Sequence, residues 1–202
     1  MRIKKNKMMI IRKFLFLVAL LIFFISAKKI DSGKGLPKNY SNPVYKEYNI
    51  PYLQKNYVAF KEAIAFKESQ GKYKAVNTLG YLGKYQLGKN TLKRFHIFDT
   101  NAFLNNPELQ EKAFLALCKV NKWIIRKDFK RSVGKTINGI KITESGILAA
   151  AHLSGAGNVK KFLRSNGLLS FKDAYGASIQ LYMKKFADYN VSRIKANRNA
   201  RI

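Results

Sequence analysis

The chain has 202 residues, of which 39 are Lys or Arg and 11 are Asp or Glu, so its formal net charge at pH 7 is +28. This charge predicts an anionic partner, namely a cell-wall polymer, a membrane surface or a nucleic acid, with a Lys-rich solvated surface as the alternative. One Cys and two His exclude an internal disulfide and leave too few ligands for a dedicated zinc site, so we expect no metal and no cofactor.

The first 27 residues have the features of an export signal. Six basic residues, the last of them Lys13, precede the apolar run Phe14–Ile25, and Ser26-Ala27 supplies small residues for cleavage. The run is shorter than the about 20 residues of a membrane span, so we expect cleavage after Ala27; left uncleaved, it would be a membrane anchor. Both outcomes predict an exported protein, periplasmic or extracellular, whose remaining net charge is about +22. Export makes nucleic acid the least expected partner.

Residues 28–54 hold three of the four prolines, together with Gly, Ser and Asn. This composition is typical of a linker or wrapping arm with no helix of its own. A single domain of ordinary size is expected to follow at residues 55–190.

The first helix of this domain is predicted to end in a carboxylate. Tyr57, Phe60 and Ile64 share one helical face, the next position in that row is Glu68, and Gly71 is a stop signal. Desolvation and the negative helix end favour a neutral Glu68, whereas neighbouring lysines favour the charged form, so the sequence leaves the balance open. A protonated carboxyl at neutral pH is the general acid that glycosidic cleavage needs, whereas a solvated surface Glu is the alternative.

A turn-rich segment follows this helix. It combines glycines, which let a ligand approach the backbone, with tyrosines, whose faces suit sugar rings. Ordinary packing under a loop is the alternative. The candidate ligand-binding residues of this segment are Asn77, Tyr81, Gly83, Tyr85 and Gln86.

Capping and turn signals mark the elements that come next. Asn90–Phe95 is expected to be a short helix, and Asn106-Pro107 begins a longer one in which Cys118 is expected to be buried. Thr136–Ile142 is predicted to be a hairpin that turns at Asn138-Gly139.

The last third of the domain is predicted to be helical as well. Thr143 caps the helix Glu144–Leu153, whose small residues allow close backbone approach; Gly155 and Gly157 are expected to break it before another helix begins at Val159. A final helix is expected over residues 177–187, and residues 191–202 are predicted to be a loose basic tail. The residues on one face of the final helix are Ile179, Tyr182, Met183 and Phe186.

Three blocks, in order, resemble one superfamily. Glu68-Ser69 with the later Gly83-Lys-Tyr-Gln86 resembles the Glu-Ser and Gly-x-x-Gln blocks of soluble lytic transglycosylases and goose-type lysozymes. Ala151-His-Leu-Ser-Gly-Ala-Gly-Asn-Val159 resembles their Ala-Tyr-Asn-Ala-Gly-x-Gly-x-Val block, and Tyr182-Met183 resembles their carboxy-terminal Tyr-Val. The resemblance covers most of residues 57–190.

The resemblance implies a lysozyme-like fold, mainly α with a small β-hairpin, in which helices flank a glycan-binding groove. It also implies a peptidoglycan substrate, with Glu68 as the acid, Gln86 and Tyr85 lining the groove, and Tyr182 pointing its hydroxyl toward Glu68. His152-Leu153 replaces the Tyr-Asn of the second block, so a sugar-binding amide is missing; His152 is expected either to replace its polar role or to be structural. Ser69 and Gly155 complete the residues expected to bind substrate.

Glu62 lies one and a half turns before Glu68 in the same predicted helix and faces elsewhere, and the other carboxylates of the domain lie near helix ends or in loops. None of them shows a motif beside Glu68. A two-carboxylate hydrolase needs a partner acid, for which Glu144 is the best candidate. A lytic transglycosylase needs only one Glu, which acts as acid and then as base to form a 1,6-anhydro product, and we favour this chemistry. The alternatives are a hydrolytic lysozyme and a non-catalytic cationic protein that binds the cell wall or membrane; a monomer is expected in each case.

Overall fold

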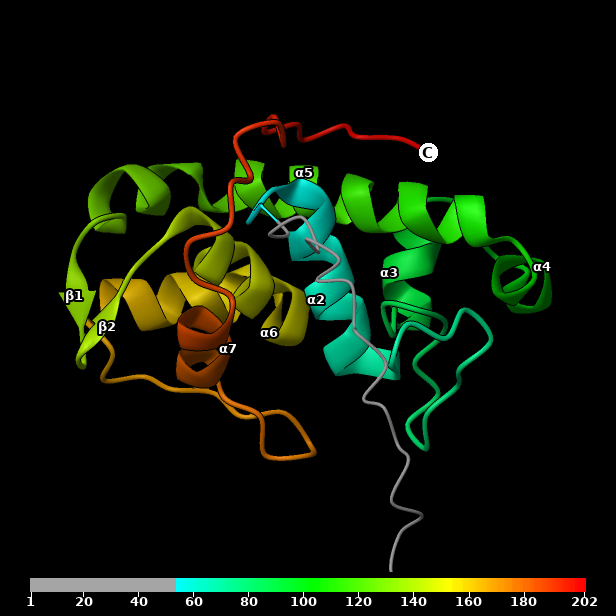
Figure 1. Cartoon of the computed structure of the whole chain (residues 1–202), viewed down its shortest axis with the longest axis horizontal. Coiled ribbons are helices and arrows are strands. Elements are labelled where there is room, and N and C mark those ends of the chain that lie inside the picture. The colour runs from blue at the N-terminus through cyan, green and yellow to red at the C-terminus, as the bar shows by residue number, and fades with distance from the viewer. Residues whose placement is uncertain (1–53) are drawn as a thin grey trace, which may run out of the picture. The chain divides into compact units, whose positions relative to one another are not determined.

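The computed structural model describes residues 54–202. The predicted export signal, and all but the last residue of the predicted arm, lie outside this range. The described part is mainly helical with one small two-stranded antiparallel sheet, which confirms the mainly α prediction (Figure 1). The elements are α2 (Tyr57–Ser69), α3 (Lys89–Arg94), α4 (Thr100–Leu104), α5 (Pro107–Ser132), β1 (Thr136–Ile137), β2 (Ile140–Lys141), α6 (Glu144–Arg164) and α7 (Ile179–Lys185).

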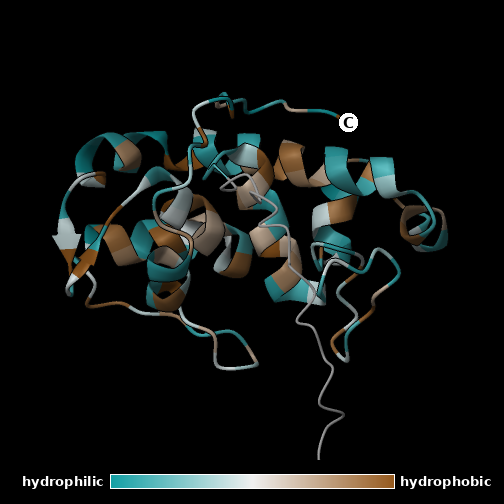
Figure 2. Cartoon of the chain, viewed as in Figure 1, coloured by the Kyte–Doolittle hydropathy of each residue, from teal (hydrophilic) through white to brown (hydrophobic). Residues whose placement is uncertain are grey.

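Among these helices, none combines the length and the apolar character required to cross a bilayer. In Figure 2, polar and apolar positions alternate around the helices, as expected for helices with one buried side.

Helix α2 has the predicted buried stripe and a well-defined end. The Asn56 side chain caps its first turn, and Phe60 and Ile64 are fully buried. The C-cap residue Gln70 is left-handed, with φ 57°, and its N–H bonds carbonyls of the last turns. The chain therefore turns away from the axis within two residues of Glu68.

The capping and turn predictions are confirmed in α5 and in the hairpin. The Asn106 side chain accepts a hydrogen bond from the Leu109 N–H, and Pro107 is the first residue of α5. Asn138 and Gly139 both have positive φ, as a two-residue hairpin turn requires. The prediction missed α4, which is only five residues long and is capped by Asp99.

Helix α6 packs against both α5 and α7, so it is central, as predicted. The predicted break at Gly155 is confirmed, because this residue leaves the helical region at φ 79° and ψ 152° and divides α6 at a kink. The predicted break at Gly157 and the restart at Val159 are wrong, because Gly155 is the one non-helical residue within α6 and the helix resumes directly after it and continues to Arg164. Ala149 and Ala150 before the kink are fully buried.

The predicted inward face of α7 is confirmed, because all four of its residues are buried. The prediction of a loose tail is wrong for the residues that follow. Ile194 is fully buried in the main core, and the Asn197 N–H donates a hydrogen bond to the Lys119 carbonyl of α5. The tail therefore runs along α5, and the domain extends beyond residue 190 (Figure 1).

Candidate active site

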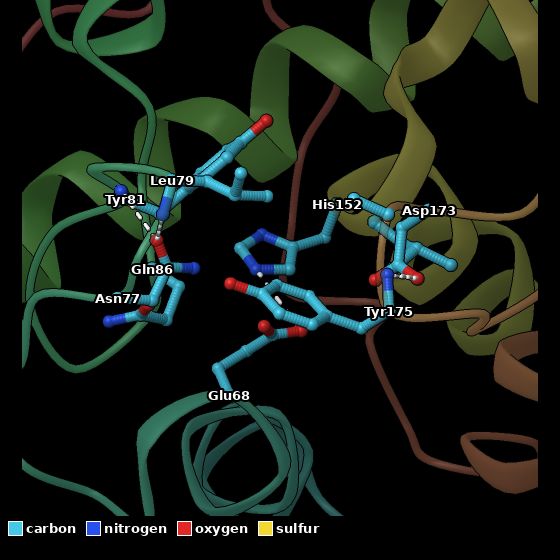
Figure 3. A pocket seen from close by; sticks show the side chains of 10 residues that line it. Glu68, Asn77, Leu79, Tyr81, Gln86, His152, Asp173 and Tyr175 are labelled. Carbon is cyan, nitrogen blue, oxygen red and sulfur yellow. Dashed lines mark hydrogen bonds and ion pairs between the residues drawn. The ribbon is translucent and has the colours of Figure 1, made fainter.

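A pocket of about 220 Å³ lies beside the end of α2 (Figure 3). Its walls come from α2, from α6, and from the two segments 70–88 and 165–178, which lie far apart in the sequence. The lining residues are Glu68, Asn77, Leu79, Tyr81, Gln86, His152, Leu153, Asp173, Ala174 and Tyr175.

Glu68 is the carboxylate at the base of this pocket. Its side chain is 17% exposed, and its Oε1 atom accepts a hydrogen bond of 2.7 Å from the Tyr182 hydroxyl. Burial, together with the nearby charge of Glu68, raises the pKa of Tyr182, so this hydroxyl stays protonated and acts as a donor. The contact implied by the resemblance is therefore present between side chains 114 positions apart.

His152 lies on α6 directly beside this carboxylate. Its side chain is 5% exposed, and its Nε2 atom is 3.8 Å from Glu68 Oε1. Burial lowers the pKa of His152, and the nearby Glu68 charge acts in the opposite direction. The net lowering keeps the imidazole neutral at pH 7.

Two amide side chains of the 70–88 segment line the pocket while they shape its backbone. Asn77 Oδ1 accepts hydrogen bonds from the Leu79 and Tyr81 N–H groups. Gln86 Nε2 donates a hydrogen bond of 2.9 Å to the Gly83 carbonyl. Tyr81 is half-exposed, and Asn77, Tyr81 and Gln86 all line the pocket; that they bind a substrate stays a prediction.

Three other candidates from the first block do not line the pocket. The Ser69 hydroxyl donates a hydrogen bond of 2.8 Å to the Lys84 carbonyl and ties the segment to α2. A Cβ atom at Gly83 would lie 2.2 Å from Gln110 Oε1, so glycine is required there for packing. The prediction that Tyr85 lines the groove is wrong: Tyr85 is 1% exposed and its ring stacks on Phe114 in the core.

In the second block of the resemblance, Ala151–Val159, one candidate residue lines the pocket and the other does not. His152 faces the pocket, whereas Gly155 forms the kink of α6 one turn later and lies outside the lining. Its positive φ allows α6 to bend, so its contribution is to the path of the helix.

A partly buried charge cluster, centred on Lys84, supports the segment that carries Gln86. Lys84 is 5% exposed, and its Nζ atom lies 2.8 Å from both Glu62 and Glu111. Burial opposes the charge on Glu111, but hydrogen bonds from Lys61, Lys84 and Tyr85 outweigh it and lower the pKa of Glu111 to about 2. Hydrogen bonds to Glu111 and Glu62 likewise overcome burial and raise the pKa of Lys84. Lys84 and Glu111 therefore stay ionised at pH 7, and their contacts fix the segment against α2 and α5.

Sequence reasoning missed the contribution of residues 173–175. Asp173 lines the pocket, and its Oδ1 atom accepts hydrogen bonds from the Tyr175 and Ala177 N–H groups. The Tyr175 hydroxyl lies 2.7 Å from Thr78 Oγ1, so the two segments are bridged across the pocket. The sequence Asp173-Ala-Tyr-Gly176 is typical of a turn that carries an aromatic side chain, and it could have indicated this part of the site.

Glu144, the best candidate for a second acid if the enzyme were a hydrolase, lies outside the pocket and pairs with Lys122 at 2.9 Å. The acid that shares the pocket with Glu68 is Asp173 instead. Within residues 54–202, no three His, Cys, Asp or Glu side chains are grouped as metal ligands.

Comparisons of the chain with protein-family models, with curated proteins and with solved structures found no match. The chemistry of the pocket is therefore argued from its geometry. A carboxyl group held by a tyrosine donor, next to a neutral imidazole and under aromatic and amide groups, is suited to transferring a proton to a bound polar ligand.

Proposed function

We propose that this chain is an exported peptidoglycan-cleaving glycosidase with a lysozyme-like fold, in which Glu68 protonates the oxygen of the MurNAc-GlcNAc β-1,4 bond. The observation that carries the proposal is the hydrogen bond from the buried Tyr182 hydroxyl to Glu68, the carboxylate that lines the pocket. A donor aimed at the carboxyl group stabilises the carboxylate that forms as the proton leaves, so it favours the transition state over the ground state.

The other groups of the pocket support a sugar ligand. Tyr81 and Tyr175 offer partly exposed rings, on which sugar faces pack, while Asn77 and Gln86 add amide groups. The volume of about 220 Å³ is below the about 300–1,000 Å³ typical of ligand pockets, so a glycan strand requires the Thr78–Tyr175 bridge to open.

The favoured reaction is that of a lytic transglycosylase. Glu68 protonates the leaving oxygen while the substrate's own N-acetyl group assists at the anomeric carbon. Glu68, now a carboxylate, then removes the proton of the 6-hydroxyl group, and that oxygen closes the 1,6-anhydro ring. No water is consumed, and Glu68 is returned to its protonated form.

A second candidate is hydrolysis, which Asp173 favours because it places a second carboxylate in the pocket. Mass spectrometry of the released muropeptides distinguishes the two reactions, since anhydro products are lighter by one water. If the products are hydrated and Asp173→Asn abolishes their formation, the enzyme is a lysozyme.

The test of catalysis is the loss of turbidity of purified cell-wall sacculi. Wild type and Glu108→Gln are expected to clear the suspension at the same rate, because Glu108 is an exposed side chain whose one ion pair within residues 54–202 is with Lys112 on α5. Glu68→Gln is expected to be at least about 100-fold slower, since it removes the general acid. Equal clearing by wild type and Glu68→Gln would refute the enzyme, and equal cosedimentation of both with sacculi would then support a cationic wall-binding protein.

A further inference from the structure

A second pocket, of about 490 Å³, lies where the C-terminal tail passes the end of α3. It shares no lining residue with the pocket of the candidate active site. We name it the arginine pocket, because Arg94, Arg198 and Arg201 line it together with the polar side chains of His96 and Asn199. Lysine is the commoner cation of this chain, so a pocket lined by arginines and by no lysine departs from the overall composition.

The guanidinium groups of the arginine pocket are available to a ligand. Arg94, Arg198 and Arg201 are exposed, and none of them forms an ion pair within residues 54–202, whereas the arginines that contact Asp128 are paired with it. Positive groups gathered without a counter-charge create a positive potential at the surface. An anion bound in the pocket would therefore interact favourably with all three groups.

The tail that carries two of these arginines is fixed to the domain. The Asn197 N–H donates a hydrogen bond of 3.1 Å to the Lys119 carbonyl, and the Asn199 N–H donates one of 2.9 Å to Asn197 Oδ1. Ala200 packs against the small buried cluster that contains Phe95. The pocket is therefore formed before a ligand arrives, so binding does not have to order the tail.

The row of arginines continues from the pocket onto α5. The Arg198 guanidinium lies 5.2 Å from the centre of the Trp123 ring, and the Arg126 guanidinium lies 4.0 Å from the same ring. Arg126 is also exposed. A row of cations fits a ligand with repeated anionic groups better than a single small anion.

The choice of arginine indicates which anion. A guanidinium group presents a planar fork of N–H donors that matches two oxygens of a phosphate group, whereas a lysine acts as a point charge. We propose that the arginine pocket and Arg126 bind successive phosphate groups of a linear phosphodiester polymer. Phe95 is 8% exposed and the Trp123 ring already contacts two guanidinium groups, so neither ring offers a platform for nucleic-acid bases. This inference goes beyond the proposed function and does not require catalysis by Glu68.

The test is a titration of the whole protein with soluble poly(glycerol phosphate) at several salt concentrations. Trp123 is the single Trp of the chain, so its fluorescence reports binding beside Arg198. The double variant Arg94→Gln/Arg198→Gln is expected to bind about 10-fold more weakly or worse, and the slope of log affinity against log salt is expected to become shallower by about 1 to 2. Isothermal titration calorimetry measures the same affinities independently of fluorescence.

The matched control is Lys184→Gln/Lys185→Gln, which removes the same charge from exposed positions on α7, outside the arginine pocket. This control is expected to bind like wild type, and equal weakening in both double variants would overturn the proposal. Arg94→Lys/Arg198→Lys keeps the charge and removes the fork. It is expected to bind more weakly than wild type at an unchanged Tm, and wild-type affinity in this variant would overturn recognition by the guanidinium groups.

Two other macromolecules are tested in parallel, namely vesicles of anionic phospholipid and duplex DNA. Phe98 is 70% exposed beside His96, where it could enter a membrane, so Phe98→Ala is included with the vesicles. Binding to vesicles or DNA that the arginine variants weaken, without binding to poly(glycerol phosphate), would overturn the proposal. Glu68→Gln is expected to bind the polymer like wild type, so a failure of the proposed catalysis leaves this test intact.

Discussion

Replacing Tyr182 by Phe removes one oxygen from the site and leaves the packing of the ring unchanged. Tyr182 is 2% exposed, and its hydroxyl is the donor to Glu68 Oε1. A hydrogen bond to a charged group contributes about 1.5–3 kcal/mol. The hydrogen bond from Tyr182 is stronger to the carboxylate form of Glu68 than to its neutral acid form. Removing this hydrogen bond therefore raises the barrier of the step in which the proton leaves Glu68. We therefore expect kcat for sacculus clearing to drop about 10- to 150-fold, with little change in KM.

Tyr85→Phe is the matched control for this variant. Tyr85 is 1% exposed, and its hydroxyl also donates to a carboxylate, that of Glu111, but outside the pocket. Urea unfolding is expected to show a loss of about 1–3 kcal/mol in both variants, whereas only Tyr182→Phe loses turnover. Similar turnover in the two variants, after correction for the folded fraction, would refute the argument that Tyr182 acts on Glu68.

Three further outcomes follow from the structure. The pKa of Glu111 is lowered to about 2, so its ionic contacts stabilise the fold fully above its ordinary pKa of 4.5 and lose that effect as the pH falls toward 2. Glu111→Gln is therefore expected to lower the free energy of unfolding by about 2 kcal/mol or more at pH 7 and by much less near pH 2, as measured in urea. Gly83→Ala is expected to lower Tm and activity together, because its Cβ would overlap Gln110, whereas Gly80→Ala, also at positive φ but in open space, is expected to have the smaller effect on Tm. Tyr175→Phe removes the bridge across the pocket and is expected to lower KM for sacculi up to about 10-fold; an increase would show that the hydroxyl binds substrate.

The helix starts and the hairpin were determined by the sequence itself. Asn106-Pro107 and Asn138-Gly139 act on backbone groups within about four positions along the chain. Their effect on the local structure is therefore predictable from neighbouring residues alone. The buried row that ends at Glu68 is equally local, since it follows from the helical repeat. The contact between Glu68 and Tyr182 was expected only from the resemblance, because no local rule joins residues so far apart.

Tertiary structure decided the rest of the site. Lys84 has the character of a surface residue, but Glu62 and Glu111 from two other elements make its burial favourable. The neighbouring Tyr85 is turned into the core by its stacking on Phe114. Asp173 lines the same pocket as Glu68 only because the segment before α7 folds back beside the end of α2. The burial of a side chain and the pairing of its charge depend on which distant elements pack together. These contacts form only when the chain folds, so local sequence patterns do not predict them.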